Sequence, residues 1–311
     1  MKEKIIIIVG PTAVGKTALS IELAKKFNGE IISGDSMQVY SKLDIGTSKV
    51  TSEEAGNIPH YLIDIKDINE DYSAADFKKE ARKKINQIVE NNKTPIIVGG
   101  TGLYIESLIY NVSHGGKADP DMAFRKEMEE VAEDKGREFV WGKLNELDPK
   151  AAEKIHPNNL VRVIRALEVY HVTGELFSTY QEERDDKELI YDTYIIGLNT
   201  NRKLLYERIN KRVDLMLKNG LLEEVKWLME NADSEAQSTK GIGYAELIEY
   251  FNGQKTMEDA VEAIKQNSRR YAKRQLTWFR NRTPVTEWYN LVQNEDKINQ
   301  VNEDVRQFLK G

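Results

Sequence analysis

A glycine-rich loop near the N-terminus is the feature that most constrains how this chain can fold. Residues 10–17 read GPTAVGKT and match the pattern G-x-x-x-x-G-K-[ST]. Residues 4–9 before it form a short β-branched run typical of a buried parallel strand, and residues 18–27 after it have helical spacing. The glycines let several backbone N–H groups face one anion at the helix N-terminus. We therefore predict a cradle for a phosphate or diphosphate group; the alternative is an ordinary glycine turn in front of a helix.

Two residues of this loop carry further chemistry. Lys16 adds a mobile positive charge, and the Thr17 hydroxyl is suited to bind Mg²⁺. An enzyme that hydrolyses nucleotides normally also has an acidic residue at the end of a buried strand. The strand predicted at 95–98 ends in Gly-Gly-Thr-Gly and has none, whereas Asp35 follows the strand predicted at 30–32. From the residues alone, Asp35 either holds a metal or acts as a base.

The order of the predicted elements indicates the fold class. Strands alternate with helices, and glycines stand at the strand ends. A further helix is predicted from Ser73, which forms a capping pattern with Asp76, to about Asn91, and a strand returns at 194–198. This alternation predicts an α/β fold: a P-loop-type core whose parallel sheet is flanked by helices, with ligands at the carboxyl edge of the sheet.

The composition changes within the chain and predicts two domains. From residue 118 to residue 188 the sequence is acid-rich, helical in pattern and poor in strand signals. We therefore expect an all-helical insertion domain at 115–191, which interrupts a core formed by 1–114 and 192–311.

Composition also excludes several classes of protein. Zero cysteines rule out disulfides, thiolate nucleophiles, iron–sulfur clusters and cysteine-based zinc sites, and the four histidines are scattered along the chain. No apolar run approaches the length of a membrane span, and the N-terminus has no signal-peptide pattern. We expect a cytoplasmic protein without membrane contact. The net charge of −6 argues against indiscriminate coating of nucleic acid, but it leaves room for a local basic groove.

Two polar clusters follow predicted strands. Residues 35–40, DSMQVY, bring an acid, a hydroxyl, an amide and a phenol to one strand end; the alternative is an Asp cap with a Tyr packed on the core. Residues 99–104, GGTGLY, form a second glycine loop. Its glycines fit either close approach of the backbone to a ligand or a tight turn between strand and helix.

A basic stretch near the C-terminus predicts an anionic partner. Residues 265–282, KQNSRRYAKRQLTWFRNR, contain seven cations and no acid, and their apolar residues have helical spacing. Arg269 with Lys273, and Arg270 with Arg274, form like-charged pairs four residues apart, which repel each other in a helix. RNA or phosphate contact would offset this repulsion, so we favour it over an ordinary solvated face.

Taken together, these motifs resemble the tRNA dimethylallyltransferase (tRNA isopentenyltransferase) family, in its bacterial form without a zinc finger. The similarity covers nearly the whole chain in the order of the family. It is carried by GPTAVGKT, DSMQVY, DIGTSK, PHYLID, GGTGLY, NNLVRVIRALEVY, RVDLMLKNGLLEEV, GIGYAE and YAKRQLTWFR. The resemblance implies transfer of a dimethylallyl group from dimethylallyl diphosphate to N6 of the adenosine 3′-adjacent to the anticodon in tRNA. It also accounts for the missing second acid, because a prenyl donor has no γ-phosphate to hydrolyse.

The resemblance further implies roles for individual residues. Asp35 would be the general base, Thr101 a hydroxyl near the reacting centre and Lys16 a catalytic cation, with Thr17 as the contact to Mg²⁺. The donor diphosphate would be bound by Gly10, Thr12, Ala13, Val14, Gly15, Lys16, Thr17, Arg208 and Arg212. The anticodon stem-loop of tRNA would be bound by Asp35, Ser36, Met37, Gln38, Thr101, Asn159, Leu160, Val161, Arg162, Val163, Gly241, Ile242, Gly243, Tyr244, Arg270, Lys273, Arg274, Gln275 and Trp278. The insertion domain would contact tRNA, and the enzyme would be active as a monomer.

Three other functions remain open at this point. A P-loop kinase of a small hydroxylated substrate needs only the phosphate loop, but the absent second acid argues against it. An isopentenyltransferase of free adenine nucleotides has no use for the basic stretch at 265–282. A non-catalytic RNA-binding module would have a vestigial phosphate loop, and nothing in the sequence supports such degeneration.

Overall fold

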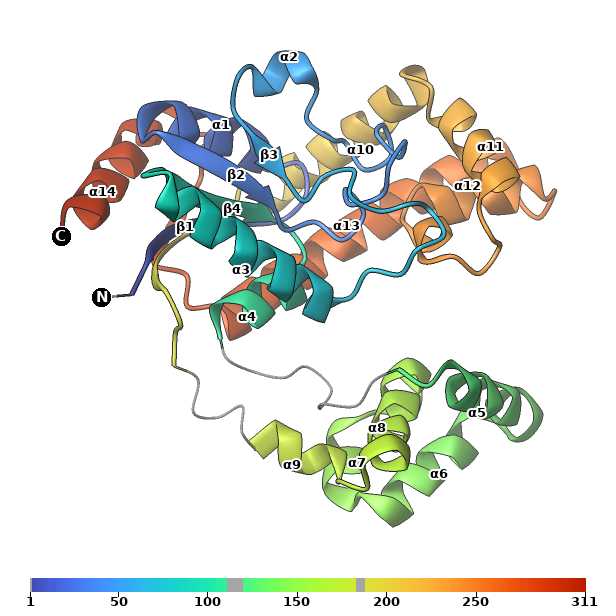
Figure 1. Cartoon of the computed structure of the whole chain (residues 1–311). Coiled ribbons are helices and arrows are strands. Elements are labelled where there is room, and N and C mark those ends of the chain that lie inside the picture. Colours follow the sequence, from blue (N-terminus) through green and yellow to red (C-terminus); the bar gives the residue numbers. More distant parts are fainter. Residues whose placement is uncertain (1, 111–119, 183–187) are drawn as a thin grey trace. The chain divides into compact units, whose positions relative to one another are not determined.

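The chain divides into two compact units in the computed structural model, which describes residues 2–110, 120–182 and 188–311 (Figure 1). The first unit comprises Met1–Ile109 and Leu189–Gly311, and the second comprises Tyr110–Glu188. The predicted boundary at 114/115 lies outside the described residues. The boundary predicted at 191/192 comes slightly too late, because Ile190 already donates a backbone hydrogen bond to Ile109 of the core, at 2.9 Å.

A six-stranded parallel sheet forms the centre of the first unit. Its strand order is β3-β2-β4-β1-β5-β6. The strands are β1 (Lys4–Val9), β2 (Gly29–Ser33), β3 (His60–Tyr61), β4 (Thr94–Gly99), β5 (Asp192–Leu198) and β6 (Glu287–Tyr289). The four strands predicted from the sequence are confirmed: β1 has the predicted limits, and the other three extend one or two residues beyond theirs. Sequence reasoning missed the two edge strands, β3 and β6, which are only two and three residues long.

The sheet is buried on both faces, which explains its continuous apolar strands. Residues 5–9 of β1 are fully buried. Ile6 and Ile8 belong to a core cluster with residues of α1 (Lys16–Lys26) and α14 (Ile298–Lys310). On the sheet, α3 (Ala74–Glu90) packs against β2 and β4. Helices thus cover the sheet as an α/β fold requires.

Local sequence signals position the helix starts. The first helix begins at Lys16, two residues before the predicted start, because the Lys and Thr of the phosphate loop form its first turn. Ser73 caps α3 as predicted: its hydroxyl accepts from the Asp76 N–H, and the Asp76 carboxylate accepts from the Ser73 N–H. The other helices of this unit are α2 (Ser52–Ala55), α4 (Gly102–Ile109), α10 (Arg202–Lys218), α11 (Leu221–Asn231), α12 (Tyr244–Phe251) and α13 (Met257–Arg282), with short 3₁₀ turns at Gln237–Lys240 and Glu295–Lys297.

The second unit is helical throughout its described part. It contains α5 (Met122–Lys135), α6 (Arg137–Leu147), α7 (Pro149–Lys154), α8 (Leu160–Thr173) and α9 (Phe177–Glu182), packed around an apolar core of their own. Glu168 is fully buried in α8 and pairs with Arg125 and Arg165. Arg165, a cation of this acid-rich segment, is therefore engaged within the unit.

None of the helices among the described residues combines the length and hydropathy needed to cross a membrane.

Candidate functional site

The candidate site lies where three neighbouring strands of the sheet end. The phosphate loop follows β1, Asp35 follows β2, and Thr101 follows β4, and these three strands are adjacent in the sheet. Gly34 donates its N–H to the carbonyl of Val98 at 2.8 Å. The strand ends approach so closely that a Cβ atom at position 99 would lie 2.2 Å from the carbonyl oxygen of Gly34. Glycine at position 99 therefore lets the Asp35 and Thr101 loops meet.

The phosphate loop has the shape that its sequence predicts. Ala13 and Gly15 adopt positive φ angles, of 64° and 98°, so the chain turns back before α1 begins. Lys16 reaches back across the loop, and its Nζ donates to the carbonyl of Pro11 at 2.8 Å. Gly10 lies against β5, where a Cβ atom would come within 2.5 Å of the Leu198 carbonyl oxygen. Its role is this close packing, whereas residues 12–17 face a cavity.

That cavity, which we call the phosphate-loop cavity, has a volume of about 450 Å³. Besides residues 12–17 it is lined by Asp35, Gln38, Thr47, Ser48, Val98, Gly99, Gly100, Arg208, Lys211, Arg212, Leu215, Tyr271 and Gln275. Both predicted arginines are present, and the Nε of Arg208 donates to the carbonyl of Ala13 at 2.8 Å. Sequence reasoning missed Lys211, although its position three residues after Arg208 on α10 places it on the same side of the helix.

The electrostatics of the phosphate-loop cavity favour an anion. Asp35 is the single carboxylate among its described lining residues, beside the four cations Lys16, Arg208, Lys211 and Arg212. Burial, reinforced by Arg212, lowers the pKa of Lys16 to about 8, and Asp35 opposes this shift. Burial also lowers the pKa of Arg212. Because these cations repel each other, a bound diphosphate would relieve their repulsion.

Asp35 and Thr101 are held in fixed positions beside this cavity. The Oδ1 atom of Asp35 accepts from the backbone N–H of Met37 at 2.9 Å, which forms a turn around the carboxylate. The Thr101 hydroxyl accepts from the Ser36 N–H at 3.1 Å. Tyr271 of α13, whose pKa is raised to about 12 by burial and by Asp35, is hydrogen-bonded to Thr101. Tyr271 was not among the site residues predicted from the sequence; the structure places its neutral phenol at the site.

A second, more apolar cavity adjoins the first; we call it the apolar cavity, and its volume is about 320 Å³. The two cavities share the lining residues Thr12, Asp35, Thr47, Arg212 and Tyr271. The rest of its lining comprises Ser36, Met37, Gly46, Ile209, Val213, Met216, Lys240, Gly241, Ile242, Ile264, Ser268 and Arg274. Five of the residues predicted to contact tRNA, namely Ser36, Met37, Gly241, Ile242 and Arg274, are thus gathered around one space beside Asp35.

Four side chains predicted to contact tRNA make contacts within the protein, and two of them, Gln38 and Gln275, also line the phosphate-loop cavity. Gln275 is 5% exposed, accepts from the N–H of Thr12 and donates to the carbonyl of Gly100, both at 3.0 Å. Gln38 accepts from Ser33 and donates to the carbonyl of Thr47. Tyr244 is 1% exposed, and Val163 is fully buried in the helical unit. For Gln275, Tyr244 and Val163, the sequence pattern did not reveal that the side chain is buried.

The other predicted tRNA contacts at the start of α8 are partly or largely exposed, whereas Gly243 is buried. Within the helical unit, Asn159 precedes α8, Leu160 begins it, Arg162 is half-buried and Val161 is 77% exposed. In the core, Gly243 has a positive φ of 99° and donates its N–H to Glu246 at 2.7 Å.

The basic stretch at 265–282 is part of the single helix α13, but two of its cations are neutralised. Lys265 pairs with Asp214 at 2.5 Å, and Arg269 pairs with Glu262 at 2.9 Å. The repulsion predicted between Arg269 and Lys273 is therefore weakened by a carboxylate outside the stretch. Arg270, Lys273 and Arg274, all predicted to contact tRNA, are exposed on this helix, and the half-buried Trp278 packs against Gly102.

The site offers one of the ligands expected for Mg²⁺. The Thr17 hydroxyl is exposed in the first turn of α1 and lines the phosphate-loop cavity. Over the described residues, no group of three or more His, Cys, Asp or Glu side chains could form a metal cage. This donor set fits Mg²⁺ held mainly by phosphate oxygens and water, which is the usual way this ion is bound beside phosphates.

Comparison with known proteins gives consistent results. Residues 38–282 match the family described as IPP transferase. The chain is 55% identical to a tRNA dimethylallyltransferase of Enterococcus faecalis, covering 99% of this chain and 98% of the relative. It is 53% identical to the enzyme of that name from Limosilactobacillus reuteri, covering 99% of both.

Two solved structures are similar along most of the chain. The crystal structure of a full-length tRNA isopentenylpyrophosphate transferase from Bacillus halodurans has a TM-score of 0.75 and 46% identity, covering 99% of this chain and 97% of that one. A eukaryotic dimethylallyltransferase acting on tRNA has a TM-score of 0.76 and 34% identity, covering 89% of this chain and 70% of that one. Both likenesses support the P-loop-type core predicted from the sequence.

Proposed function

The chain belongs to the IPP transferase family, and we infer that it is a tRNA dimethylallyltransferase. It transfers the dimethylallyl group of dimethylallyl diphosphate to N6 of the adenosine 3′-adjacent to the anticodon, and it releases diphosphate. The observation that carries this inference is the meeting of two unlike cavities at Asp35. One is cationic and formed around a phosphate loop, and the other is largely apolar and lined by residues predicted to contact tRNA.

The phosphate-loop cavity would bind the donor. Backbone N–H groups of residues 12–17 and the N-terminus of α1 bind its diphosphate, together with Lys16. Arg208, Lys211 and Arg212 face the same space from α10. As the bond between the allylic carbon and the diphosphate oxygen lengthens, negative charge grows on the leaving group, and these cations stabilise that charge.

Asp35 would receive the proton. The lone pair of N6 forms the new bond to C1 of the donor, and the electron pair of the C1–O bond leaves with the diphosphate. The amine proton passes to the Asp35 carboxylate, which lies where the two cavities meet. The Asp35 turn and the Thr101 bond to Ser36 fix this geometry before substrate arrives. No covalent enzyme intermediate is needed, because the allylic carbon eases departure of the leaving group.

Magnesium would assist the leaving group. The Thr17 hydroxyl is the protein group that would hold Mg²⁺, and the ion would supply positive charge to the diphosphate when bound.

The adenosine would enter through the apolar cavity after leaving its stack in the anticodon loop, at a cost of about a few kcal/mol. Arg270, Lys273 and Arg274 on α13 would contact backbone phosphates beside this entrance. Residues of one chain line both cavities, so we propose that a monomer is sufficient.

A direct assay tests the proposal. The protein is incubated with Mg²⁺, dimethylallyl diphosphate and an unmodified tRNA, and the digested nucleosides are identified by mass. We expect an adenosine that has gained one dimethylallyl group, located 3′ to the anticodon. Phosphoryl transfer from ATP without alkylation would instead identify a kinase. Modification of free adenine nucleotides, but not of tRNA, would identify the free-nucleotide transferase.

A further inference from the structure

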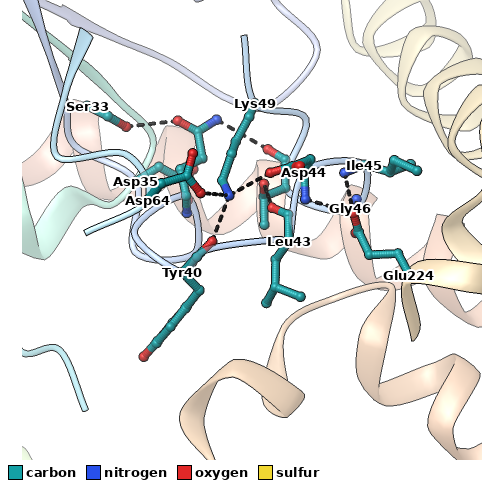
Figure 2. Close-up of polar contacts among 12 residues, drawn as sticks. Ser33, Asp35, Tyr40, Leu43, Asp44, Ile45, Gly46, Lys49, Asp64 and Glu224 are labelled. Carbon is teal, nitrogen blue, oxygen red and sulfur yellow. Dashed lines mark hydrogen bonds and ion pairs between the residues drawn. The ribbon is translucent and has the colours of Figure 1, made fainter. Parts of the chain in front are cut away.

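The loop between Asp35 and Lys49 forms a wall of both cavities. Thr47 lines both cavities, Gly46 lines the apolar cavity, and Ser48 lines the phosphate-loop cavity. The first half of this loop makes backbone hydrogen bonds to residues 64–66, beside the isolated bridge between Tyr40 and Lys66. Side chains hold the second half of the loop: the Gln38 amide donates to the carbonyls of Thr47 and Ser48, and the charged groups of Glu224 and Lys49 make the contacts shown in Figure 2.

Glu224 of α11 binds one end of the loop with both oxygens of its carboxylate. Its Oε2 atom accepts from the backbone N–H groups of Asp44 and Ile45, at 2.7 and 2.8 Å. Its Oε1 atom accepts from the N–H of Gly46 at 2.8 Å and from the Tyr244 hydroxyl at 2.7 Å. A carboxylate has about four acceptor positions, and all are used here. The charge of Glu224, which is 9% exposed, is thus compensated by the loop that it holds.

Lys49 holds the same loop from the other side. Its Nζ donates to the carbonyl of Tyr40 at 2.6 Å and pairs with the carboxylates of Asp44 and Asp64, at 2.8 and 2.5 Å. The Lys49 side chain is only 5% exposed. Asp44 is therefore fixed twice, by its side chain to Lys49 and by its backbone to Glu224, as Figure 2 shows.

The Glu224 contacts also join the loop to the Gly241–Tyr244 segment, whose Gly241 and Ile242 line the apolar cavity. Tyr244 packs so closely on Gly46 that a Cβ atom there would lie 2.6 Å from its ring. Met37 touches Gly241 in the same way, with its Cε atom 2.6 Å from a Cβ position on that glycine. Loop 35–49 and the Gly241–Tyr244 segment, distant in sequence, thus form one continuous surface on the adenosine side of the site.

We propose that Glu224 is a positioning residue of the tRNA side of the site, a role that rests on the proposed function. It lines neither cavity in the described structure, and it acts by fixing Gly46, the neighbour of Thr47, against the Gly241–Tyr244 segment. The donor diphosphate is held mainly by residues 12–17 and α10, so donor binding does not depend on Glu224. A purely structural carboxylate would instead affect both substrates and the stability of the fold together.

The test compares Glu224→Gln with Glu223→Gln. Glu223 is the exposed neighbour on the same helix and serves as the matched control. Glutamine keeps the shape of Glu224, but its NH₂ group cannot accept from an N–H or from Tyr244. Because hydrogen bonds to a buried charge are removed, we expect kcat/KM for tRNA to fall about 10- to 100-fold. The KM for dimethylallyl diphosphate should change less than about twofold, since its contacts are retained. Glu223→Gln should match the unaltered protein in both.

Amide hydrogen exchange provides a readout independent of turnover. Exchange at Asp44, Ile45 and Gly46 should accelerate in Glu224→Gln but not in Glu223→Gln, because Glu224 is their acceptor. Unchanged exchange, or accelerated exchange with unchanged kcat/KM for tRNA, would overturn the proposal. A parallel rise in the donor KM would also overturn it and assign Glu224 a general structural role.

A milder variant covers the case in which Glu224→Gln does not fold. Tyr244→Phe keeps the ring against Gly46 and removes one of the four hydrogen bonds to Glu224. We expect it to lower kcat/KM for tRNA by about threefold to tenfold, again with the donor KM unchanged. A Tyr244→Phe variant with normal kcat/KM for tRNA would then overturn the proposal. If the unaltered protein transfers no prenyl group, the proposed function fails, and the exchange rates alone decide whether Glu224 holds the loop.

Discussion

The side chain of Gln275 joins the phosphate loop to the second glycine loop. Its Oε1 atom accepts from the N–H of Thr12 at 3.0 Å, and its Nε2 atom donates to the carbonyl of Gly100 at 3.0 Å. Gly100 has no room for a side chain, since a Cβ atom would lie 2.1 Å from that Nε2. Because Gln275 lies on α13, beside the exposed Arg274, the helix proposed to contact tRNA also fixes the donor site.

Gln275→Glu should separate this role from RNA contact. The carboxylate can still accept from Thr12, but it cannot donate to Gly100, and it adds a negative charge beside the bound diphosphate. We expect the KM for dimethylallyl diphosphate to rise about tenfold or more, while the affinity for an anticodon stem-loop stays within about threefold. Initial rates with each substrate varied in turn, and filter binding of the RNA, measure both. A loss confined to RNA affinity would instead mean that Gln275 contacts tRNA.

Asp35→Asn should abolish most turnover and spare RNA binding. The amide oxygen can still accept from the Met37 N–H, so the turn is retained while the base is removed. We expect single-turnover rates to fall by about 10²- to 10⁴-fold with little change in the affinity for the stem-loop. Asp35→Ala removes the turn as well and shows what the turn adds. Collapse of RNA binding in Asp35→Asn would mean that the carboxylate docks RNA and is not a base.

Donor affinity should weaken as the pH rises through about 8. Burial and Arg212 lower the pKa of Lys16 to about 8 in the unliganded protein, so the ammonium loses its proton above this pH. An anionic diphosphate favours the charged form, and binding above the pKa must take up a proton. Between about pH 8 and about pH 9.5, we expect the Kd for dimethylallyl diphosphate to rise by up to about tenfold per unit.

Calorimetry at several pH values, in buffers of different ionisation enthalpy, measures both the Kd and the proton uptake. Lys16→Met should bind dimethylallyl diphosphate more weakly, and its Kd should change with pH only as the donor itself titrates. The difference between the Kd profiles of the two proteins therefore isolates the contribution of Lys16. Identical profiles would contradict the assignment of this titration to Lys16.

Local sequence signals predicted the framework of the site well. The spacing of GPTAVGKT specifies a strand, a loop and a helix within a few residues, so Lys16 and Thr17 could be placed without a structure. Asp35 was found because it follows an apolar run that forms a strand, whereas Thr101, at the end of the neighbouring strand, was named through the family resemblance. Each of these signals depends on residues adjacent in the chain.

Long-range pairing was not predictable in the same way. Glu224 and Gly46 are far apart in sequence, and nothing near either residue indicates that a carboxylate accepts three consecutive N–H groups. The burial of Gln275 depends on which face of α13 meets the phosphate loop. The pairing of Lys265 with Asp214 joins two helices. In each case tertiary packing, rather than local pattern, decides whether a polar side chain meets solvent or the core.

The pairing pattern on α13 sharpens a prediction about RNA binding. Arg270 and Arg274 are exposed, whereas Arg269 is bound to Glu262 and to Asn210. The double variant Arg270→Ala, Arg274→Ala should weaken stem-loop binding and reduce the slope of log K against log salt by about 0.7 to 0.9 for each RNA phosphate that is no longer neutralised. Arg269→Ala is the matched control and should leave the slope unchanged, because its charge is already compensated. Equal slopes in all three proteins would place the RNA phosphates elsewhere, since only cations that release counterions from RNA contribute to this slope.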